Sequence, residues 1–420
     1  MNKEDLKEQF QIDRRTLIKT GGAAGLAALL GTQVTSWGAS EKPIKIGMVD
    51  PMTGTYAALG HSEITGAKLA EAEINKAGGV LGRPLQLFVE DSAGNPGTAV
   101  DKCSRLLSQN EVDFLMGTVN SASSLAVSQF ASRHHKLYVC TGGHVDSLTG
   151  SDCKSTTFRT CSTTWMLTAG DFDLLYKKFG KKWYFITPDY AFGHALQADY
   201  TKQLKKVGGF VAGAALTPLG TTDFTSYLIN AKATSPDVLC LLVAGNDLVN
   251  CMKQITQFGL DKSMAVGGSM MELEPLQALP QTARYGWWTM EWYWNQPKVP
   301  HVASFVESYK AASGGEYPSA RSWFGYASTH AIALAVARAQ STDTDRVVRA
   351  MEGLALPPEV ALKPGQAVYR AADHQLLSGM YPGEVVKGGK YPNLFHVAEV
   401  VPGSKIALPA SVSGCELPKA

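Results

Sequence analysis

The sequence predicts a doubly wound α/β fold with enough chain for two domains. Short apolar runs alternate with amphipathic stretches along most of the chain, a pattern typical of a parallel sheet flanked by helices. The chain has 420 residues, of which 45% are hydrophobic and 18% charged, so it can bury a large core. Its formal net charge of +2 gives no indication of a nucleic acid or an anionic membrane surface as a partner.

The first forty residues have the features of an export signal. Arg14-Arg15 is followed by apolar residues and Lys19, and residues 21–31 are rich in glycine and alanine but too short to span a bilayer. This arrangement resembles a twin-arginine export signal. Residues 1–40 contain no cysteine, which argues against a lipoprotein anchor, and no later segment is apolar enough to cross a membrane. We therefore expect a periplasmic protein without stable membrane insertion.

The folded part is expected to begin near residue 44. Residues 44–49 form an apolar run that predicts a buried strand, and residues 60–77 have the apolar spacing of an amphipathic helix. Gly78-Gly79 follows, as glycines often do at the end of a helix. Residues 85–89 predict the next strand, and a second helix should end near Leu107.

The stretch 112–148 predicts a ligand-binding edge. Residues 112–116 and 137–140 are apolar runs expected to be parallel strands, joined by a helix that starts in a polar cluster at 118–124. A glycine turn, residues 141–143, follows the second run. The helix start and the turn would then lie together at the carboxyl edge of the sheet, where free backbone N–H groups favour an anion such as a carboxylate. The alternative is that Ser121 to Ser124 only cap the helix.

Later elements continue the alternation. Two apolar runs, residues 182–186 and 238–243, predict further buried strands. The segment from Pro382 onward is rich in proline and glycine and is expected to wrap the surface. Helices are predicted over residues 171–179, 193–207 and 248–258.

All seven cysteines follow the export signal, and an oxidising compartment permits disulfides. Cys153 and Cys161 flank a short loop and are the first candidate pair; Cys240 and Cys251 are the second. The odd number leaves at least one thiol unpaired. No Cys-x-x-Cys or Cys/His spacing suggests a metal site, so we expect neither a metal nor a cofactor.

Residues 74–85 (INKAGGVLGRPL) and 90–92 resemble the N-terminal signature of the leucine/isoleucine/valine-type periplasmic solute-binding proteins, which are the extracytoplasmic receptors of ABC importers. The resemblance continues at Phe158-Arg159-Thr160 and Asp189–Gly193, and it remains visible at residues 369–375. It implies the type I periplasmic-binding fold, in which two doubly wound parallel-sheet lobes are joined by a three-strand hinge. It also implies a small-molecule ligand and the membrane subunits of an importer as partners, and we expect a monomer.

Mapped onto this chain, the resemblance divides it into lobes. The N-terminal lobe takes residues 43–158 and 293–367, the C-terminal lobe takes 163–288 and 370–400, and residues 401–420 form a surface tail. The three hinge crossings are expected near residues 159–161, 289–291 and 369–370.

The resemblance places the ligand between the lobes. Carried over by position, Ser121, Ala122 and Ser123 would meet a ligand carboxylate, and the turn Thr141-Gly142-Gly143 would meet its polar groups. His144 follows that turn and Trp165 follows the first crossing, so both are added as candidates. The second lobe would contribute four residues from its strand ends: Tyr190, Phe192, Asn246 and Met270.

Two positions depart from the pattern of amino-acid binders. Leu59 stands where they often have an aromatic residue, and Met270 lies where they place a carboxylate for the ligand ammonium; Glu272 is close but displaced. Trp165 and the tryptophans within 287–294 offer rigid apolar surface that suits an aromatic ring, unless they pack inside the fold. We therefore expect an aromatic or hydrophobic carboxylate as ligand. A branched-chain amino acid is the alternative, followed by an amide or urea binder or a periplasmic ligand sensor.

An enzyme is not expected. The sequence has no G-x-S-x-G elbow, H-E-x-x-H motif, Walker A loop or dinucleotide fingerprint. We therefore predict no catalytic residue.

Overall fold

The computed structural model describes residues 42–417, so the predicted export signal lies outside the described residues. The first of its two large sheets is parallel throughout, with strand order β2-β1-β3-β4-β5. Each strand is a short run of apolar residues, as predicted, because both faces of the sheet are covered by helices. Its strands are β1 (Ile44–Asp50), β2 (Leu85–Asp91), β3 (Phe114–Gly117), β4 (Tyr138–Cys140) and β5 (Thr157–Arg159).

Helices cover both faces of this first sheet. On one face, α1 (Ala57–Lys76) and α10 (Ala320–Ala339) pack against Ile46, Met48 and Phe114. On the other face, α2 (Pro96–Arg105) and α3 (Ser121–Arg133) pack against Val49 and Leu115. The helices α9 (Val302–Ser313), α11 (Thr344–Met351) and α12 (Pro358–Ala361) lie outside α1 and α10.

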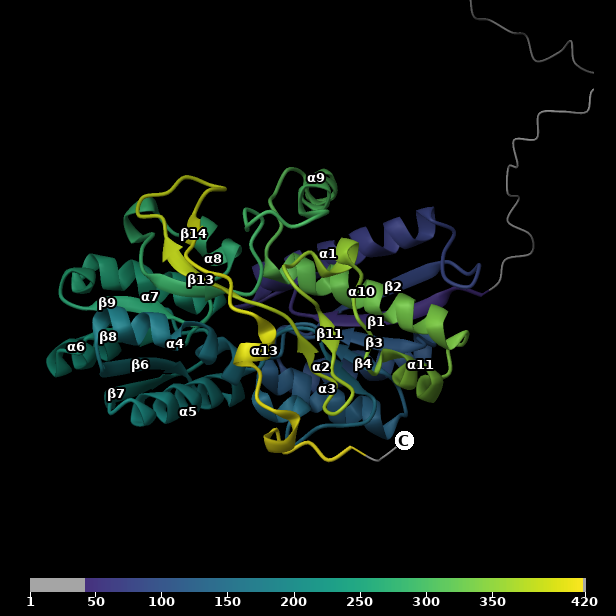
Figure 1. Cartoon of the computed structure of the whole chain (residues 1–420), viewed down its shortest axis with the longest axis horizontal. Helices are drawn as coiled ribbons and strands as arrows, with labels where there is room; N and C mark the ends of the chain where they lie inside the picture. Colours follow the sequence, from purple (N-terminus) through teal and green to yellow (C-terminus); the bar gives the residue numbers. More distant parts are fainter. Residues whose placement is uncertain (1–41, 418–420) are drawn as a thin grey trace, which may run out of the picture. The chain divides into compact units, whose positions relative to one another are not determined.

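The second sheet has strand order β14-β13-β10-β9-β8-β6-β7 (Figure 1). Its central strands are parallel, whereas β13 and β14 are antiparallel additions at one edge. Residues after Pro382 were expected to wrap the surface, but β13 and β14 join the sheet because β10 offers them a free edge. The strands are β6 (Lys182–Pro188), β7 (Phe210–Thr217), β8 (Val238–Leu241), β9 (Ala265–Gly268), β10 (Trp287–Met290), β13 (Tyr381–Val385) and β14 (Phe395–Val397).

This second sheet is also covered on both faces. The helices α4 (Thr164–Phe179) and α5 (Ala191–Lys206) bury one face, around Trp183 and Phe185. On the other face lie α6 (Thr225–Thr234), α7 (Gly245–Gln257) and α8 (Leu273–Ala278). The two sheets therefore form two doubly wound α/β lobes, which confirms the predicted fold class.

Side chains join the segments that link the lobes. Glu291, after β10, accepts a hydrogen bond from the Ser162 amide at 2.7 Å, just after β5. The Arg159 guanidinium donates Nε to the Gln375 side chain at 2.6 Å. Gln375 directly precedes β12 (Leu376–Leu377), which pairs with β11 (Val368–Tyr369) in a small sheet. The chain enters the second large sheet only at Tyr381, later than the expected crossing near 369–370.

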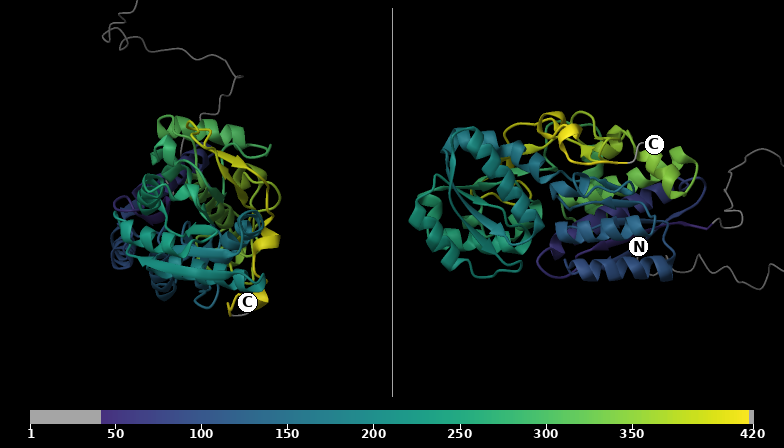
Figure 2. Two further views of the ribbon diagram at one scale, coloured as in Figure 1. Left: turned by 90° about the vertical axis from the view of Figure 1, so that its left-hand side faces the viewer. Right: turned by 90° about the horizontal axis from the view of Figure 1, so that it is seen from below.

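The C-terminal segment returns from the second sheet to the first lobe (Figure 2). After α13 (Gly403–Ile406), which contacts α4, it reaches the loop between β4 and β5, where Cys415 forms a disulfide with Cys153. Both predicted pairings are therefore wrong. Cys161, Cys240 and Cys251 are free thiols buried in the packed interior of the protein. Cys153 lies instead in a surface loop, away from them.

Candidate ligand-binding site

A small cavity lies where the strand ends of the two lobes face each other. Its volume is about 10 Å³, room for about one water molecule, so the two walls nearly touch. The first lobe lines it with Tyr56, Leu59, Val119, His144 and Arg321, and the second with Tyr190, Phe192, Ala244 and Met270.

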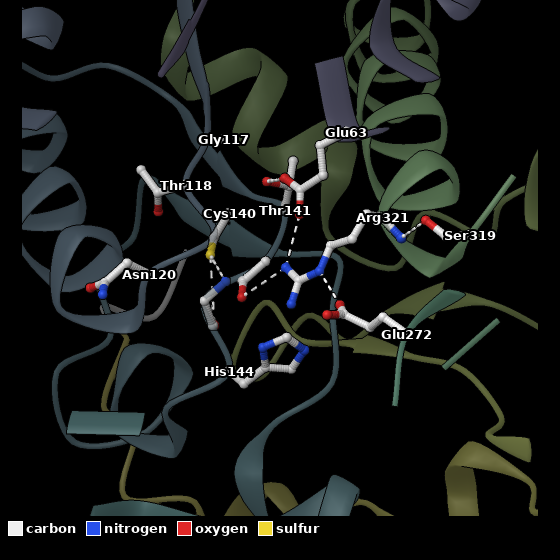
Figure 3. Close-up of polar contacts among 12 residues, drawn as sticks. Glu63, Gly117, Thr118, Asn120, Cys140, Thr141, His144, Glu272, Ser319 and Arg321 are labelled. Carbon is white, nitrogen blue, oxygen red and sulfur yellow. Dashed lines mark hydrogen bonds and ion pairs between the residues drawn. The ribbon is translucent and has the colours of Figure 1, made fainter. Parts of the chain in front are cut away.

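Arg321 is the cationic side chain of this wall (Figure 3). It enters at the start of α10, whose Ser319 caps the helix by accepting the Arg321 and Ser322 amides. Its side chain is only 1% exposed. Nη1 donates to Glu63 Oε1 at 2.9 Å, and Nε pairs with Glu272. Nη2 has only a 3.9 Å contact with the Met270 sulfur, so one edge of the guanidinium remains available to a ligand.

Two carboxylates offset the cost of this buried cation. A positive charge at a helix N-terminus opposes the helix dipole, and burial removes its hydration. Although burial acts against the charge, Glu272 and Glu63 raise the pKa of Arg321 well above its ordinary value. Burial in turn raises the pKa of Glu272 to about 7, against the opposing influence of Arg321. The guanidinium is therefore charged at every physiological pH.

Glu63 connects Arg321 to the first sheet. Its position on α1 brings one carboxylate oxygen to Nη1 of Arg321 and the other to the Thr141 hydroxyl, which donates to it. Asp50, fully buried at the end of β1, lies next to it. Burial and the neighbouring charge of Glu63 raise the pKa of Asp50 well above its ordinary value.

His144 supplies a second polar group to the wall. Its Nε2 lies 2.6 Å from the Glu291 carboxylate, and both side chains are almost fully buried. Burial disfavours the Glu291 anion, but His144 and the Ser162 amide more than compensate and lower its pKa to about 2. The linked Glu291 therefore fixes the orientation of the imidazole at the point where the lobes meet.

The start of α3 is built as the sequence predicted, but the Ser121 hydroxyl makes its hydrogen bonds within the protein. Asn120 caps the helix by accepting the Ser123 amide at 3.0 Å. Ser121 Oγ accepts the amides of His144 and Val145 at 3.1 and 3.3 Å. Ser121, Ala122 and Ser123 do not line the cavity, and Ser121 holds the loop that carries His144.

The glycine turn lies behind the cavity, and the absence of a side chain at Gly142 leaves space for the guanidinium of Arg321. A Cβ on Gly142 would lie 2.1 Å from Arg321 Nη1, and a Cβ on Gly143 would lie 1.9 Å from Ser124 Oγ. The Gly142 carbonyl accepts from Nη1 at 3.4 Å. Thr141 and Gly142 thus position Glu63 and Arg321, and neither they nor Gly143 lie in the cavity wall.

Of the second-lobe candidates, the structure brings Tyr190, Phe192 and Met270 into the wall. Asn246 is exposed, and only its backbone N–H reaches the first lobe, 3.2 Å from the Thr55 carbonyl. Trp165 lies on the outer side of α4, where its ring is 5.0 and 5.1 Å from the ammonium groups of Lys202 and Lys206.

The other tryptophans also lie away from the cavity. Trp288 and Trp292 are buried in the cores of the two lobes, and Trp287 packs beneath Lys178. The aromatic surface expected from them is supplied instead by Tyr56 and Tyr190, whose hydroxyls are 2.7 Å apart.

Sequence reasoning missed several wall residues, above all Arg321 and its partner Glu63. One signal was present: Arg321 is a cation at the start of a long apolar segment, Ala320 to Ala339, where the helix dipole disfavours it. Such a residue needs buried anions nearby. Across residues 42–417 there is no grouping of three or more histidine, cysteine or acidic side chains able to hold a metal ion. Within the same residues no helix has the length and apolar character needed to cross a bilayer.

Two doubly wound lobes that meet around a small, largely apolar cavity with one buried arginine define a solute-binding protein of the periplasmic type. The chain belongs to the periplasmic binding protein family, which it matches over residues 43–390. This confirms the type I periplasmic solute-binding resemblance.

Individual relatives agree with this assignment. The Leu/Ile/Val-binding protein homolog 8 of Brucella suis is 27% identical over 349 residues, 79% of this chain and 86% of the relative. A periplasmic binding protein from Burkholderia mallei is 30% identical, with a TM-score of 0.83 over 90% of this chain and 99% of that one. An ABC-transporter solute-binding protein from Rhodopseudomonas palustris, solved with 3,4-dihydroxybenzoic acid, shares the fold at a TM-score of 0.76 and 22% identity, over 86% of this chain and 98% of that one.

Proposed function

We propose that this protein is an extracytoplasmic receptor that binds an aromatic or hydrophobic carboxylate and delivers it, unchanged, to the membrane subunits of an ABC importer. The observation that carries this proposal is the free Nη2 edge of Arg321 in a wall that is otherwise largely apolar. A charge-assisted hydrogen bond from a guanidinium to a carboxylate is among the stronger polar contacts in proteins. Leu59, Val119 and Phe192 suit the apolar body of such a ligand.

The proposed binding site requires the lobes to move. A cavity of about 10 Å³ is too small for a benzoate-sized solute, so the lobes must separate to admit it and then close again around it, with the wall side chains displaced to make room. Separation breaks polar contacts between the lobes, among them the Tyr56–Tyr190 hydrogen bond, the Arg321–Glu272 ion pair and the Asn246–Thr55 hydrogen bond. Water can satisfy the groups that these contacts release, which keeps the free energy of opening small.

Relatives support two ligand classes. The Brucella suis homologue is named for leucine, isoleucine and valine, and the Rhodopseudomonas palustris protein was solved with an aromatic acid. We favour the acid because the buried carboxylates near the cavity, Glu63 and Glu272, are already paired with Arg321. A branched-chain amino acid is the second candidate.

Titration calorimetry on the mature protein tests this function. We expect benzoate or 4-hydroxybenzoate to bind with micromolar or tighter affinity, and leucine and urea to give no heat. Tight leucine binding without a response to the aromatic acids would overturn the proposed ligand class. Turnover of a bound acid would overturn the binding role, and co-purification with a membrane kinase in place of importer subunits would indicate a sensor.

A further inference from the structure

Two carboxylates converge on one guanidinium at the cavity wall. Glu63 comes from α1 in the first lobe and Glu272 from the N-terminus of α8 in the second, yet both contact Arg321 (Figure 3). Their side chains are 0% and 4% exposed. Both acidic groups in contact with this part of the wall are therefore paired with a cation of the protein itself.

We infer that Arg321 is a specificity-determining residue: its guanidinium fills the place where a ligand ammonium would otherwise bind, and so excludes amino acids and amines. The inference deepens the proposed carboxylate specificity and rests on it.

An ammonium ligand would need an unpaired anion in the cavity wall. An ammonium taken from water into a buried site must be paired with an anion, because its desolvation is otherwise too costly. Glu63 and Glu272 are the acidic groups within contact of Arg321, and Asp50, fully buried behind Glu63, does not line the cavity. An incoming ammonium must therefore displace Arg321.

Arg321 is tethered, so this displacement is strongly disfavoured. Its backbone is fixed by the Ser319 cap, its Nη1 also donates to the Gly142 carbonyl, and the absence of a side chain at Gly142 leaves space for the guanidinium. A tethered group competes as if it were present at very high local concentration. A free amine at physiological concentration cannot outcompete it.

Removing the guanidinium should expose the hidden cation site. In Arg321→Ala, Glu63 and Glu272 lose their partner and a space of about one guanidinium remains between them. Alkylammonium and alkylguanidinium ions carry the missing charge and fit that space. The variant should therefore bind cations that the parent protein ignores.

The experiment measures Tm against n-butylammonium and N-ethylguanidinium, with matched sodium chloride, for the parent and for Arg321→Ala. We expect a concentration-dependent rise of several degrees in the variant only, and at least tenfold tighter cation binding by calorimetry. Arg338→Ala is the matched control, because Arg338 lies on the same helix and contacts only the Ala350 carbonyl, at 3.3 Å. It should give no cation response.

A second variant covers the case in which two unpaired carboxylates prevent folding. Arg321→Ala/Glu272→Gln keeps only Glu63, so it removes the charge repulsion and should retain a weaker cation response. The inference is overturned if neither variant responds to a cation, or if the parent responds equally. The cation measurements do not require the parent protein to bind a carboxylate. If the proposed ligand class is wrong, this is seen in a separate experiment, because the parent protein then does not bind benzoate.

Discussion

The phenolic hydroxyls of Tyr56 and Tyr190 meet across the two lobes at 2.7 Å. Tyr56 belongs to the loop before α1, and Tyr190 precedes α5 in the second lobe. Burial and the neighbouring hydroxyl raise the pKa of Tyr56 well above its ordinary value, so both groups are neutral and one donates to the other. This hydrogen bond can form only when the lobes are closed.

Replacing either tyrosine by phenylalanine should weaken closure. Each single variant leaves one hydroxyl without its partner, at a cost of about 1 kcal/mol, which corresponds to about fivefold weaker ligand binding. Because Tyr56→Phe/Tyr190→Phe removes both hydroxyls, its loss should be smaller than the sum of the two single losses. Calorimetry of the four proteins with the same acid measures this coupling. Strict additivity would show that the hydrogen bond does not contribute to closure.

Gly245 at the start of α7 should be required for close approach of the lobes. Its φ is +56°, and a Cβ there would lie 2.6 Å from the Thr55 carbonyl oxygen and 2.8 Å from the Tyr56 ring. Gly245→Ala should therefore hold the lobes apart, weaken ligand binding at least tenfold and increase the radius of gyration in solution scattering.

The matched control for this substitution is Gly259→Ala. Gly259 has a φ of +65°, but a Cβ there would have no atom within 4 Å, so the substitution introduces the same backbone strain without the clash. Both variants should lose about 1–2 kcal/mol of stability from the left-handed conformation. If the two variants bind the ligand with equal affinity, the close approach at Gly245 is not required for the lobes to close.

The sequence alone predicted those helices and strands whose buried residues form a regular local pattern of apolar side chains. The apolar run predicted for 44–49 is β1 (Ile44–Asp50), and the helix predicted for 193–207 is α5 (Ala191–Lys206). Trp165 shows where this reasoning fails. The helix predicted from Asp171 begins at Thr164, so Trp165 is a helical residue that packs against the α5 lysines and not a loop residue near the ligand.

The candidate site was less predictable because its contacts join distant segments. Glu63 and Arg321 are 258 positions apart, and no local pattern relates a residue of α1 to one of α10. His144, Tyr190, Phe192 and Met270 were accessible to sequence reasoning because each follows the end of a strand in a parallel sheet. No such positional rule applies to Leu59 on α1 or Arg321 on α10.

The Cys153–Cys415 disulfide should contribute substantially to stability. It closes a loop with a sequence separation of 262, and losing a disulfide of this kind typically costs about 2–5 kcal/mol. Cys415→Ser should lower Tm by several degrees in calorimetry. Dithiothreitol should lower the Tm of the parent to that of Cys415→Ser and leave the variant unchanged. A further decrease in the variant would mean that another pair of cysteines is oxidised.

Asp199 on α5 should make the protein less stable as the pH rises. Burial and the nearby Asp146 raise its pKa from 3.8 to about 8, with Thr164 and Lys202 opposing the shift. A carboxyl whose pKa is higher in the folded state favours folding below about pH 4, where it is protonated in both states, and this contribution is lost as the pH rises through 8.

Asp199→Asn removes this titration and should stabilise the protein more at pH 8 than at pH 5, by about 1–2 kcal/mol. One titrating group can change the free energy of unfolding by at most about 1.4 kcal/mol per pH unit. The effect is smaller here because Asp199 is only partly buried. Urea denaturation at both pH values measures the difference. Asp173→Asn is the control, because Asp173 is exposed and paired with Lys177. If both variants change equally between pH 5 and pH 8, the Asp146–Asp199 contact does not set the pH dependence of stability.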